Sequence, residues 1–296
     1  MKISIITVCK NPGERIKKTV ESVQAQTYQN IEHIVIDGAS TDGTVEWLSG
    51  LAAVKSEEGL SLNPSPKGKG LSILPVPLGK GLGERSAHDS RFTFKFFSSP
   101  DTGIYNAMNK GIDHSTGNYL LFLNAGDYLF DKNTISDVVE NINKDNFQAD
   151  IYFGDIISED PASETRYKAP NRLAKINSLK LFFWCVPHAA SFIRKSFFIK
   201  TGGYDERFKI SGDYDFFVKA LINENAKFKY FAKSVSVFLT DGISSDVRYR
   251  KLLKHENLQI IRKYYGYLPG VLYNNCLVLF LLRFAYKIRL KFEEKS

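Results

Sequence analysis

The stretch from Ile34 to Thr44, which reads IVIDGASTDGT, constrains the fold more than any other part of this chain. A short apolar run ends in Asp37, and a turn-prone segment rich in Gly, Ser and Asp follows at once. A parallel strand delivers a carboxylate in this way to the carboxyl edge of an open α/β sheet, where ligands bind. Such a carboxylate can accept hydrogen bonds from the base or ribose of a nucleotide, although a strand that merely ends in a polar turn would have the same pattern.

The segments around this stretch fit a doubly wound sheet. The apolar run over residues 3–8 is too short for a secretion signal and has no cleavage-like site, so we expect it to form the first strand. Ile16, Val20 and Val23 recur at helical spacing and predict an amphipathic helix, and residues 31–36 predict the second strand. A strand, a helix and a parallel strand are the opening of such a fold.

Residues 50–92 interrupt the pattern. They hold seven Gly and four of the ten Pro in the chain, and no helical or strand period continues through them. The Gly-Lys pairs at 68–69 and 79–80 invite comparison with a phosphate-binding loop, but the G-x4-G-K-[ST] spacing is absent. We therefore predict a long, mobile loop insertion on the surface.

Regular periodicity returns after the insertion and becomes α+β from about residue 165. The expected strands cover 93–97, 118–123, 150–153 and 226–238, and the expected helices cover 104–112, 134–142, 194–200 and 213–224.

Acidic residues stand at the ends of successive predicted strands. Asp37, Asp101 and Asp127 each follow one strand, so their side chains should converge on the same edge of the sheet. Asp213 and Asp215 instead open a predicted helix. Because acidic residues favour the N-terminal end of a helix, capping alone explains Asp215, whereas Asp213 is the stronger candidate to face the sheet edge.

The order of these motifs resembles that of the bacterial family 2 glycosyltransferases, which are nucleotide-sugar-dependent enzymes with a GT-A fold. The resemblance covers roughly residues 1–48 and 93–245. It implies an α/β fold with a Rossmann-like, mostly parallel sheet flanked by helices, a glycosyltransferase domain over residues 1–245, and an α+β acceptor region in the C-terminal part of that domain. Besides 34–44, the segments that carry it are DTGIYNAMNKG at 101–111, FLNAGD at 122–127, Pro187-His188 and SGDYDF at 211–216.

The resemblance implies donor-binding roles for several residues. Thr7 and Val8 would line the nucleotide pocket, Asp37 would bind the base, and Asp101 would lie near the base and ribose. Asn109, in the third motif, is a further expected donor-binding position.

The resemblance also implies the catalytic groups. Asp127 would hold a divalent metal, Mg²⁺ or Mn²⁺, on the diphosphate. Asp213 would be the base that takes the proton of the attacking hydroxyl, and direct displacement with one base implies inversion at the anomeric carbon. Two positions depart from the family pattern. The first aspartate of the metal motif is Asn124 here, and an arginine often found in the third motif is Met108.

His188 follows Pro187 just ahead of a predicted strand. The resemblance places it with the donor-binding residues, where it could contact the diphosphate, the metal or the acceptor. A lone histidine in such a place is equally typical of a structural hydrogen bond. Asp155 ends another predicted strand and is a further candidate for the acceptor side.

The net charge of +8 belongs to the C-terminal end. Residues 247–296 contain eleven Lys or Arg and three Glu, which accounts for all of it. A nucleic-acid-binding protein would carry basic residues over its folded surface, so nucleic acid is not an expected partner. We expect a basic, partly apolar helical tail over residues 246–296. It would either lie on an anionic membrane surface or pack on the domain.

The expected function is transfer of a sugar from a nucleotide-diphosphate sugar to a hydroxyl of a glycan or lipid-linked acceptor, in cell-surface polysaccharide or glycolipid synthesis. Three widely separated cysteines predict a reduced, cytoplasmic protein. The basic tail adds the expectation that this protein is peripheral on the inner face of the membrane. A catalytically weak nucleotide-sugar-binding module and a nucleotidyltransferase stay open as alternatives. A dinucleotide-dependent oxidoreductase is disfavoured because no G-x-G-x-x-G follows the first strand.

Overall fold

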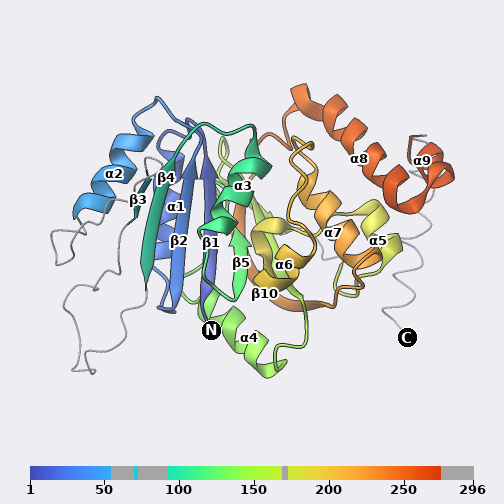
Figure 1. Ribbon diagram of the computed structural model, residues 1–296, viewed down its shortest axis with the longest axis horizontal. Coiled ribbons are helices and arrows are strands. Elements are labelled where there is room, and N and C mark those ends of the chain that lie inside the picture. Colours follow the sequence, from blue (N-terminus) through green and yellow to red (C-terminus); the bar gives the residue numbers. More distant parts are fainter. Residues whose placement is uncertain (55–69, 73–91, 169–172, 275–296) are drawn as a thin grey trace.

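The computed structural model describes residues 1–54, 70–72, 92–168 and 173–274, and these residues form one mixed sheet with helices on both faces (Figure 1). Its N-terminal half is parallel, in the order β4-β2-β1-β5. The strands of this half are β1 (Ile3–Cys9), β2 (Ile31–Asp37), β4 (Thr93–Ser98) and β5 (Tyr119–Phe122).

The C-terminal half of the sheet is mixed. Strand β9 (Ser191–Arg194) lies antiparallel between β5 and β7 (Ile151–Asp160), and β10 (Phe228–Leu239) pairs in parallel with β7. Short antiparallel strands complete the sheet: β3 (Gly70–Ser72), β6 (Tyr128–Leu129) and β8 (Thr165–Lys168). The predicted α/β class is confirmed, and the parallel character holds for the half that is built from strand–helix–strand units.

The helices bury both faces of the sheet. Alternate residues of β1 point to opposite sides, so Ile5 joins one hydrophobic cluster and Ile6 joins the other. One face carries α1 (Arg15–Gln24), α2 (Thr44–Val54) and α4 (Thr134–Lys144), and the other carries α3 (Ile104–Asp113), α5 (Ser178–Phe183), α6 (Lys195–Lys200), α7 (Gly212–Ile222) and α8 (Arg250–Tyr265). All of the elements expected between residues 93 and 238 are present.

The expected insertion at 50–92 differs at two places. Helix α2 continues to Val54, and Gly70–Ser72 forms β3 along the edge of β4. A three-residue strand is too short to produce a period in the sequence, which is why the pattern does not predict it. The rest of the insertion lies outside the described residues, so its mobility stays a prediction.

Helix α8 packs into the folded core, while the expected division of the chain at residue 245 stays a prediction. Ile260 and Ile261 are fully buried in the cluster that also contains α7. The Nζ of Lys263 lies 2.9 Å from Oδ1 of Asp215, a buried carboxylate on α7. A final short helix, α9 (Tyr267–Asn274), follows α8 in Figure 1, and the remaining tail lies outside the described residues.

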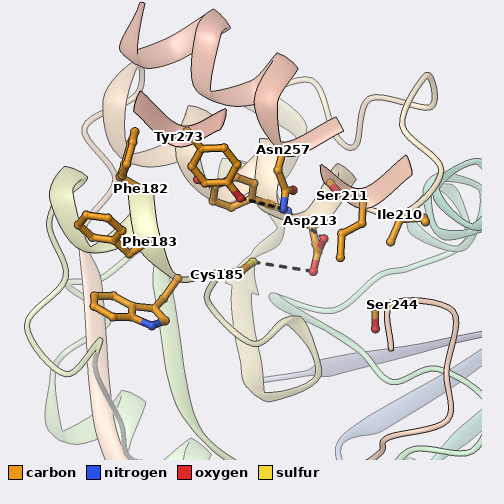
Figure 2. Close-up of a pocket in the computed structure, with 12 residues that line it drawn as sticks. Phe182, Phe183, Cys185, Ile210, Ser211, Asp213, Ser244, Asn257 and Tyr273 are labelled. Carbon is orange, nitrogen blue, oxygen red and sulfur yellow. Dashed lines mark hydrogen bonds between the residues drawn. The ribbon is translucent and has the colours of Figure 1, made fainter. Parts of the chain in front are cut away.

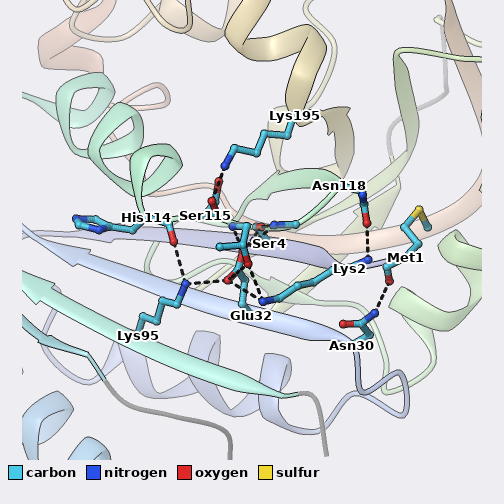
Figure 3. A network of polar contacts seen from close by, with 12 residues as sticks. Met1, Lys2, Ser4, Asn30, Glu32, Lys95, His114, Ser115, Asn118 and Lys195 are labelled. Carbon is cyan, nitrogen blue, oxygen red and sulfur yellow. Dashed lines mark hydrogen bonds and ion pairs between the residues drawn. The ribbon is translucent and has the colours of Figure 1, made fainter. Parts of the chain in front are cut away.

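A buried acid joins the strands at the amino end of the sheet (Figure 3). Glu32 of β2 is fully buried and accepts hydrogen bonds from Ser4 Oγ at 2.6 Å, Lys95 Nζ at 2.9 Å and the backbone N–H of Gly117 at 2.9 Å. Burial alone would raise the pKa of Glu32, but the hydrogen bonds from Ser4, Thr116 and Lys95 outweigh it and lower the pKa to about 2. Glu32 therefore ties β1, β4 and the loop before β5 to β2.

We expect Glu32→Gln to destabilise the protein at neutral pH. The pKa of Glu32 lies near 2 in the folded state against 4.5 ordinarily. Its charge therefore stabilises the fold fully above pH 4.5, and this stabilisation fades as the pH falls toward 2. The loss at pH 7 should be on the order of 3 kcal/mol. Urea unfolding should show the gap between wild type and variant shrinking between pH 6 and pH 3.

Glu14→Gln is the matched control because the Glu14 side chain is 84% exposed in its pair with Lys17, and it should change little at either pH. A gap for Glu32→Gln that is equally large at pH 3 would contradict the account.

Candidate active site

Three carboxylates gather at the carboxyl edge of the parallel strands. Cys9 ends β1 at this edge, and burial together with the negative charges of Asp37, Asp42 and Asp101 raises the pKa of its thiol. Cys9 Sγ lies 3.5 Å from Asp37 Oδ1, and the side chain of Asp101 lies against Gly38, which directly follows Asp37. The convergence that the strand ends predict is confirmed for Asp37 and Asp101, and we call these two with Asp42 the donor edge.

The carboxylate of Asp37 accepts hydrogen bonds from other groups of the protein. It is fully buried and accepts hydrogen bonds from the backbone N–H of Ser40 at 2.9 Å, from Ser98 Oγ at 2.7 Å and from Ser40 Oγ. These bonds fasten the loop after β2 to the end of β4. Its role in binding the base stays a prediction.

Gly38 lets the two loops of the donor edge meet. A Cβ atom on Gly38 would lie 2.3 Å from Asp101 Oδ2, which no other residue type could accommodate without movement. Asp101 itself accepts a hydrogen bond from Gly103 N–H at 3.0 Å. Thr7 and Val8 are buried in β1, with Thr7 Oγ1 2.9 Å from His33 Nε2. Their expected place in a nucleotide pocket stays a prediction.

Asn109 serves as a clamp between α3 and the loop after α6. Its Nδ2 donates to the carbonyl of Tyr204 at 3.0 Å and to Glu206 Oε1 at 2.9 Å, and its Oδ1 accepts from the N–H of Tyr204 at 3.2 Å. Both ends of the amide are thus occupied by protein groups. Its donor-binding role is untested and stays a prediction.

The expected base lies in the first turn of α7. The Tyr105 hydroxyl shares its proton between the carbonyl of Ile210 at 2.6 Å and Asp213 Oδ1 at 3.1 Å, and His188 Nδ1 lies 3.1 Å from Oδ2. The side chain of Asp213 is 20% exposed, so a substrate hydroxyl can reach it. Figure 2 shows Cys185 beside it, with Sγ 4.0 Å from Oδ2. Tyr105 and Cys185 are contacts that the sequence does not reveal.

His188 connects the base to the metal motif. Its Nε2 lies 3.1 Å from Asn124 Nδ2. An amide nitrogen can only donate, so Nε2 accepts and the neutral ring carries its proton on Nδ1, facing Asp213. Burial by itself would lower the pKa of His188, but the hydrogen bond to Asp213 and the charges of Asp213 and Asp127 raise it overall.

Asp127 and Asn124 lie in the same loop, after β5, and each has a side-chain oxygen of a kind that binds hard cations. Asp127 is buried, and this burial raises its pKa to about 7 against the opposing effects of His188 and the N–H of Leu239. Asn124 Oδ1 is buried and has no hydrogen-bond partner among the described residues. Two such oxygens fit a hard cation that fills its other positions with phosphate oxygens and water. No group of three or more His, Cys, Asp or Glu in the described chain could hold an ion by itself.

Glu256 of α8 fixes the segment that leads into α7, and sequence reasoning missed it. It is buried and accepts the backbone N–H groups of Lys209 at 2.8 Å, Ile210 at 3.0 Å and Ser211 at 2.9 Å. Asp213 lies two residues after Ser211, so Glu256 helps to position this expected base. The one signal in the sequence is that Glu256 stands as the only acid among six Lys or Arg between residues 248 and 263.

A cavity of about 230 Å³ opens beside Asp213 (Figure 2). We call it the side cavity. Helices α5, α7, α8 and α9 supply most of its walls, which include Phe182, Phe183, Trp184, Ser211, Asn257 and Tyr273.

Comparison with known proteins agrees with this geometry. The family model described as "Glycosyl transferase family 2" matches residues 4–73 and 83–202. An uncharacterized glycosyltransferase of Mycobacterium tuberculosis is 30% identical over 221 residues, which cover 74% of this chain and 69% of the relative. A PGL/p-HBAD biosynthesis glycosyltransferase of the same species is 26% identical over 252 residues, which cover 85% of this chain and 82% of the relative.

Solved structures share the fold at low sequence identity. S. aureus TarS 1-349 in complex with UDP-GlcNAc has a TM-score of 0.63 at 16% identity, over 89% of this chain and 65% of that one. The mannosyltransferase PcManGT of Pyrobaculum calidifontis, in complex with GDP-Man and Mn²⁺, has a TM-score of 0.59 at 13% identity, over 88% of this chain and 63% of that one. Because the family model matches more than half of the chain, this protein is a member of glycosyl transferase family 2.

Proposed function

We propose that the protein transfers a sugar from a nucleoside-diphosphate sugar to a hydroxyl of a glycan or lipid-linked acceptor, with inversion. The observation that carries this proposal is the hydrogen-bond chain from Asn124 through His188 to Asp213, which joins the metal motif and the base in one site. The UDP-GlcNAc and GDP-Man complexes of the structural neighbours support a nucleotide-sugar donor. The PGL/p-HBAD relative supports a glycolipid product.

Departure of a nucleoside diphosphate concentrates negative charge on the leaving oxygens. A divalent cation held by Asp127 and Asn124 Oδ1 would stabilise that charge when bound. The two residues would orient the diphosphate, so that the anomeric carbon faces Asp213.

Asp213 would accept the proton of the acceptor hydroxyl. Tyr105 and His188 hold the carboxylate by hydrogen bonds, which fixes its direction before the acceptor arrives. Attack from the side opposite the leaving diphosphate inverts the anomeric carbon. A positioned base contributes typically ~10²–10⁴-fold to such a step.

We expect Asp213→Asn to lower kcat by at least about 10²-fold, since the amide cannot take up the proton, while donor affinity stays nearly unchanged. Nucleoside diphosphate release with acceptor present measures kcat, and calorimetry measures donor affinity. Asp215→Asn is the control on the same helix. It should weaken the pair with Lys263 and lower the melting temperature, yet keep turnover. Retained turnover in Asp213→Asn would refute the base assignment, and release of pyrophosphate would identify a nucleotidyltransferase.

We expect Asp127→Ala to abolish metal-dependent donor binding, because the substitution removes the one carboxylate of the metal motif. Calorimetric titration with the nucleotide sugar in Mn²⁺ should give no measurable heat for the variant, whereas wild type should bind in Mn²⁺ and not in EDTA. Asp137→Ala, at a partly exposed position on α4 where the carboxylate pairs with Lys233, is the control and should bind like wild type. Equal affinity of Asp127→Ala and wild type would place the metal elsewhere.

We also propose that the protein works at an anionic membrane surface, where a lipid-linked acceptor would be found. Among the described helices, none is long and apolar enough to cross a bilayer. The start of α8 and the turn before it combine exposed Val247 and Tyr249 with the exposed cations Arg248, Lys251 and Lys254. Apolar and basic side chains on one surface are typical of interfacial binding.

Removing residues 275–296 should weaken binding to vesicles that contain phosphatidylglycerol, because five Lys or Arg are lost. Changing Lys251 and Lys254 to Glu in the full chain should also weaken binding to these vesicles. Sedimentation with sucrose-loaded vesicles measures both effects, and vesicles of phosphatidylcholine alone are the control. Undiminished sedimentation of both variants would contradict the membrane proposal.

A further inference from the structure

We infer that the side cavity encloses one sugar ring of the acceptor, and that Ser211 and Asn257 select this ring through hydroxyls next to the one that reacts. The inference rests on the proposed function and adds the substrate class. It also assigns a specificity role to α8, which lies beyond the residues matched by the family model.

The position of the side cavity favours the acceptor. Asp213 forms part of its wall, so a hydroxyl bound there would meet the base directly. The described donor-edge residues Asp37, Asp42 and Asp101 do not line it. The cavity therefore lies next to the reacting carboxylate and apart from the place expected for the nucleotide.

The size of the side cavity sets the amount of substrate that it can enclose. Its volume is about 230 Å³, below the roughly 300–1,000 Å³ of sites that bury a drug-sized ligand. One ring fits, and the rest of a glycan or a lipid linker would have to leave through the opening. Phe182, Phe183 and Trp184 offer apolar surface to the faces of such a ring.

Two buried polar atoms of the wall have no hydrogen-bond partner among the residues that the structure describes. Ser211 is only 2% exposed and stands at the N-cap of α7, yet its hydroxyl makes no capping bond and has no hydrogen-bond partner in the described chain. Serine is among the preferred capping residues, so an unused hydroxyl here is unusual. Asn257 donates Nδ2 to the Tyr273 hydroxyl at 3.4 Å, while its buried Oδ1 has no partner among the same residues.

These unpaired groups distinguish between acceptor classes. A buried polar group without a partner destabilises the state that contains it. The hydroxyls of a sugar ring would pair with Ser211 Oγ and Asn257 Oδ1, whereas a phenol or a fatty alcohol brings only the hydroxyl that faces Asp213. A polyhydroxylated ring is therefore the acceptor that this wall recognises.

The first test compares acceptors on the wild-type protein, with the nucleotide sugar that it hydrolyses. The probes are the methyl glycosides of glucose, galactose, mannose and rhamnose, against p-cresol and n-octanol. We expect at least one methyl glycoside to accelerate nucleoside diphosphate release at least tenfold over hydrolysis, and the two alcohols to have no such effect. Greater acceleration by p-cresol or n-octanol, or none by any glycoside, would overturn the inference.

The second test uses variants of the wall. Asn257→Leu and Ser211→Ala should each raise the acceptor KM about tenfold or more and leave the donor KM unchanged. Gln259→Leu, an exposed position on the same helix, is the matched control. Melting temperatures check that the variants fold. Kinetics with deoxy forms of the best glycoside then test recognition of single hydroxyls, which a loss of stability alone would not change. The deoxy form that lacks the hydroxyl bound by Asn257 should be used equally well by wild type and Asn257→Leu.

The outcomes separate the inference from the proposed function. A change in donor KM instead of acceptor KM would assign the side cavity to the donor sugar and overturn the inference alone. Failure of the wild-type protein to bind or hydrolyse any nucleotide sugar would overturn the proposed function, and the inference with it.

Discussion

The contact on which the site depends is the pairing of His188 with Asp213. It joins elements that are far apart in the sequence, because His188 lies just before β9 and Asp213 lies on α7. The same ring contacts Asn124 in the loop after β5. A single imidazole therefore sets the position of the base relative to the metal motif. Because the Asn124 nitrogen binds the ring, its oxygen has no partner among the described residues, and this oxygen is the one that the proposed cation would use.

The C-terminal helices hold the other side of the base. Glu256 accepts hydrogen bonds from three backbone N–H groups just before α7, and Lys263 forms an ion pair with the buried Asp215. A carboxylate that accepts several backbone hydrogen bonds is a rigid support even when it is buried. In consequence, α8 supports Asp213 and also contributes Asn257 to the side cavity. The segment that carries the charge excess of the chain is thus coupled to the site.

The sequence predicts the N-terminal half well, because its strands and helices have strong local periods and the acids follow strand ends. Asp37 and Asp101 converge as those strand ends require. Contacts between distant segments leave no such pattern. The motif around Asn109 does not reveal its hydrogen bonds to Tyr204. The basic segment around Glu256 does not reveal that this carboxylate is buried. The strand expected just after His188 is present as β9, but its antiparallel place between β5 and β7 follows from packing and not from its four residues.

The most direct test of the central claim is a thermal-shift panel of UDP-, GDP-, dTDP- and CMP-sugars, each with Mn²⁺ and with EDTA. A ligand that binds only the native state raises the unfolding midpoint in proportion to its affinity. If the donor edge and the metal motif together hold a nucleotide sugar, sugars of one nucleotide should raise the midpoint in Mn²⁺ and lose that effect in EDTA. No shift with any donor, or an equal shift with and without metal, would contradict the account.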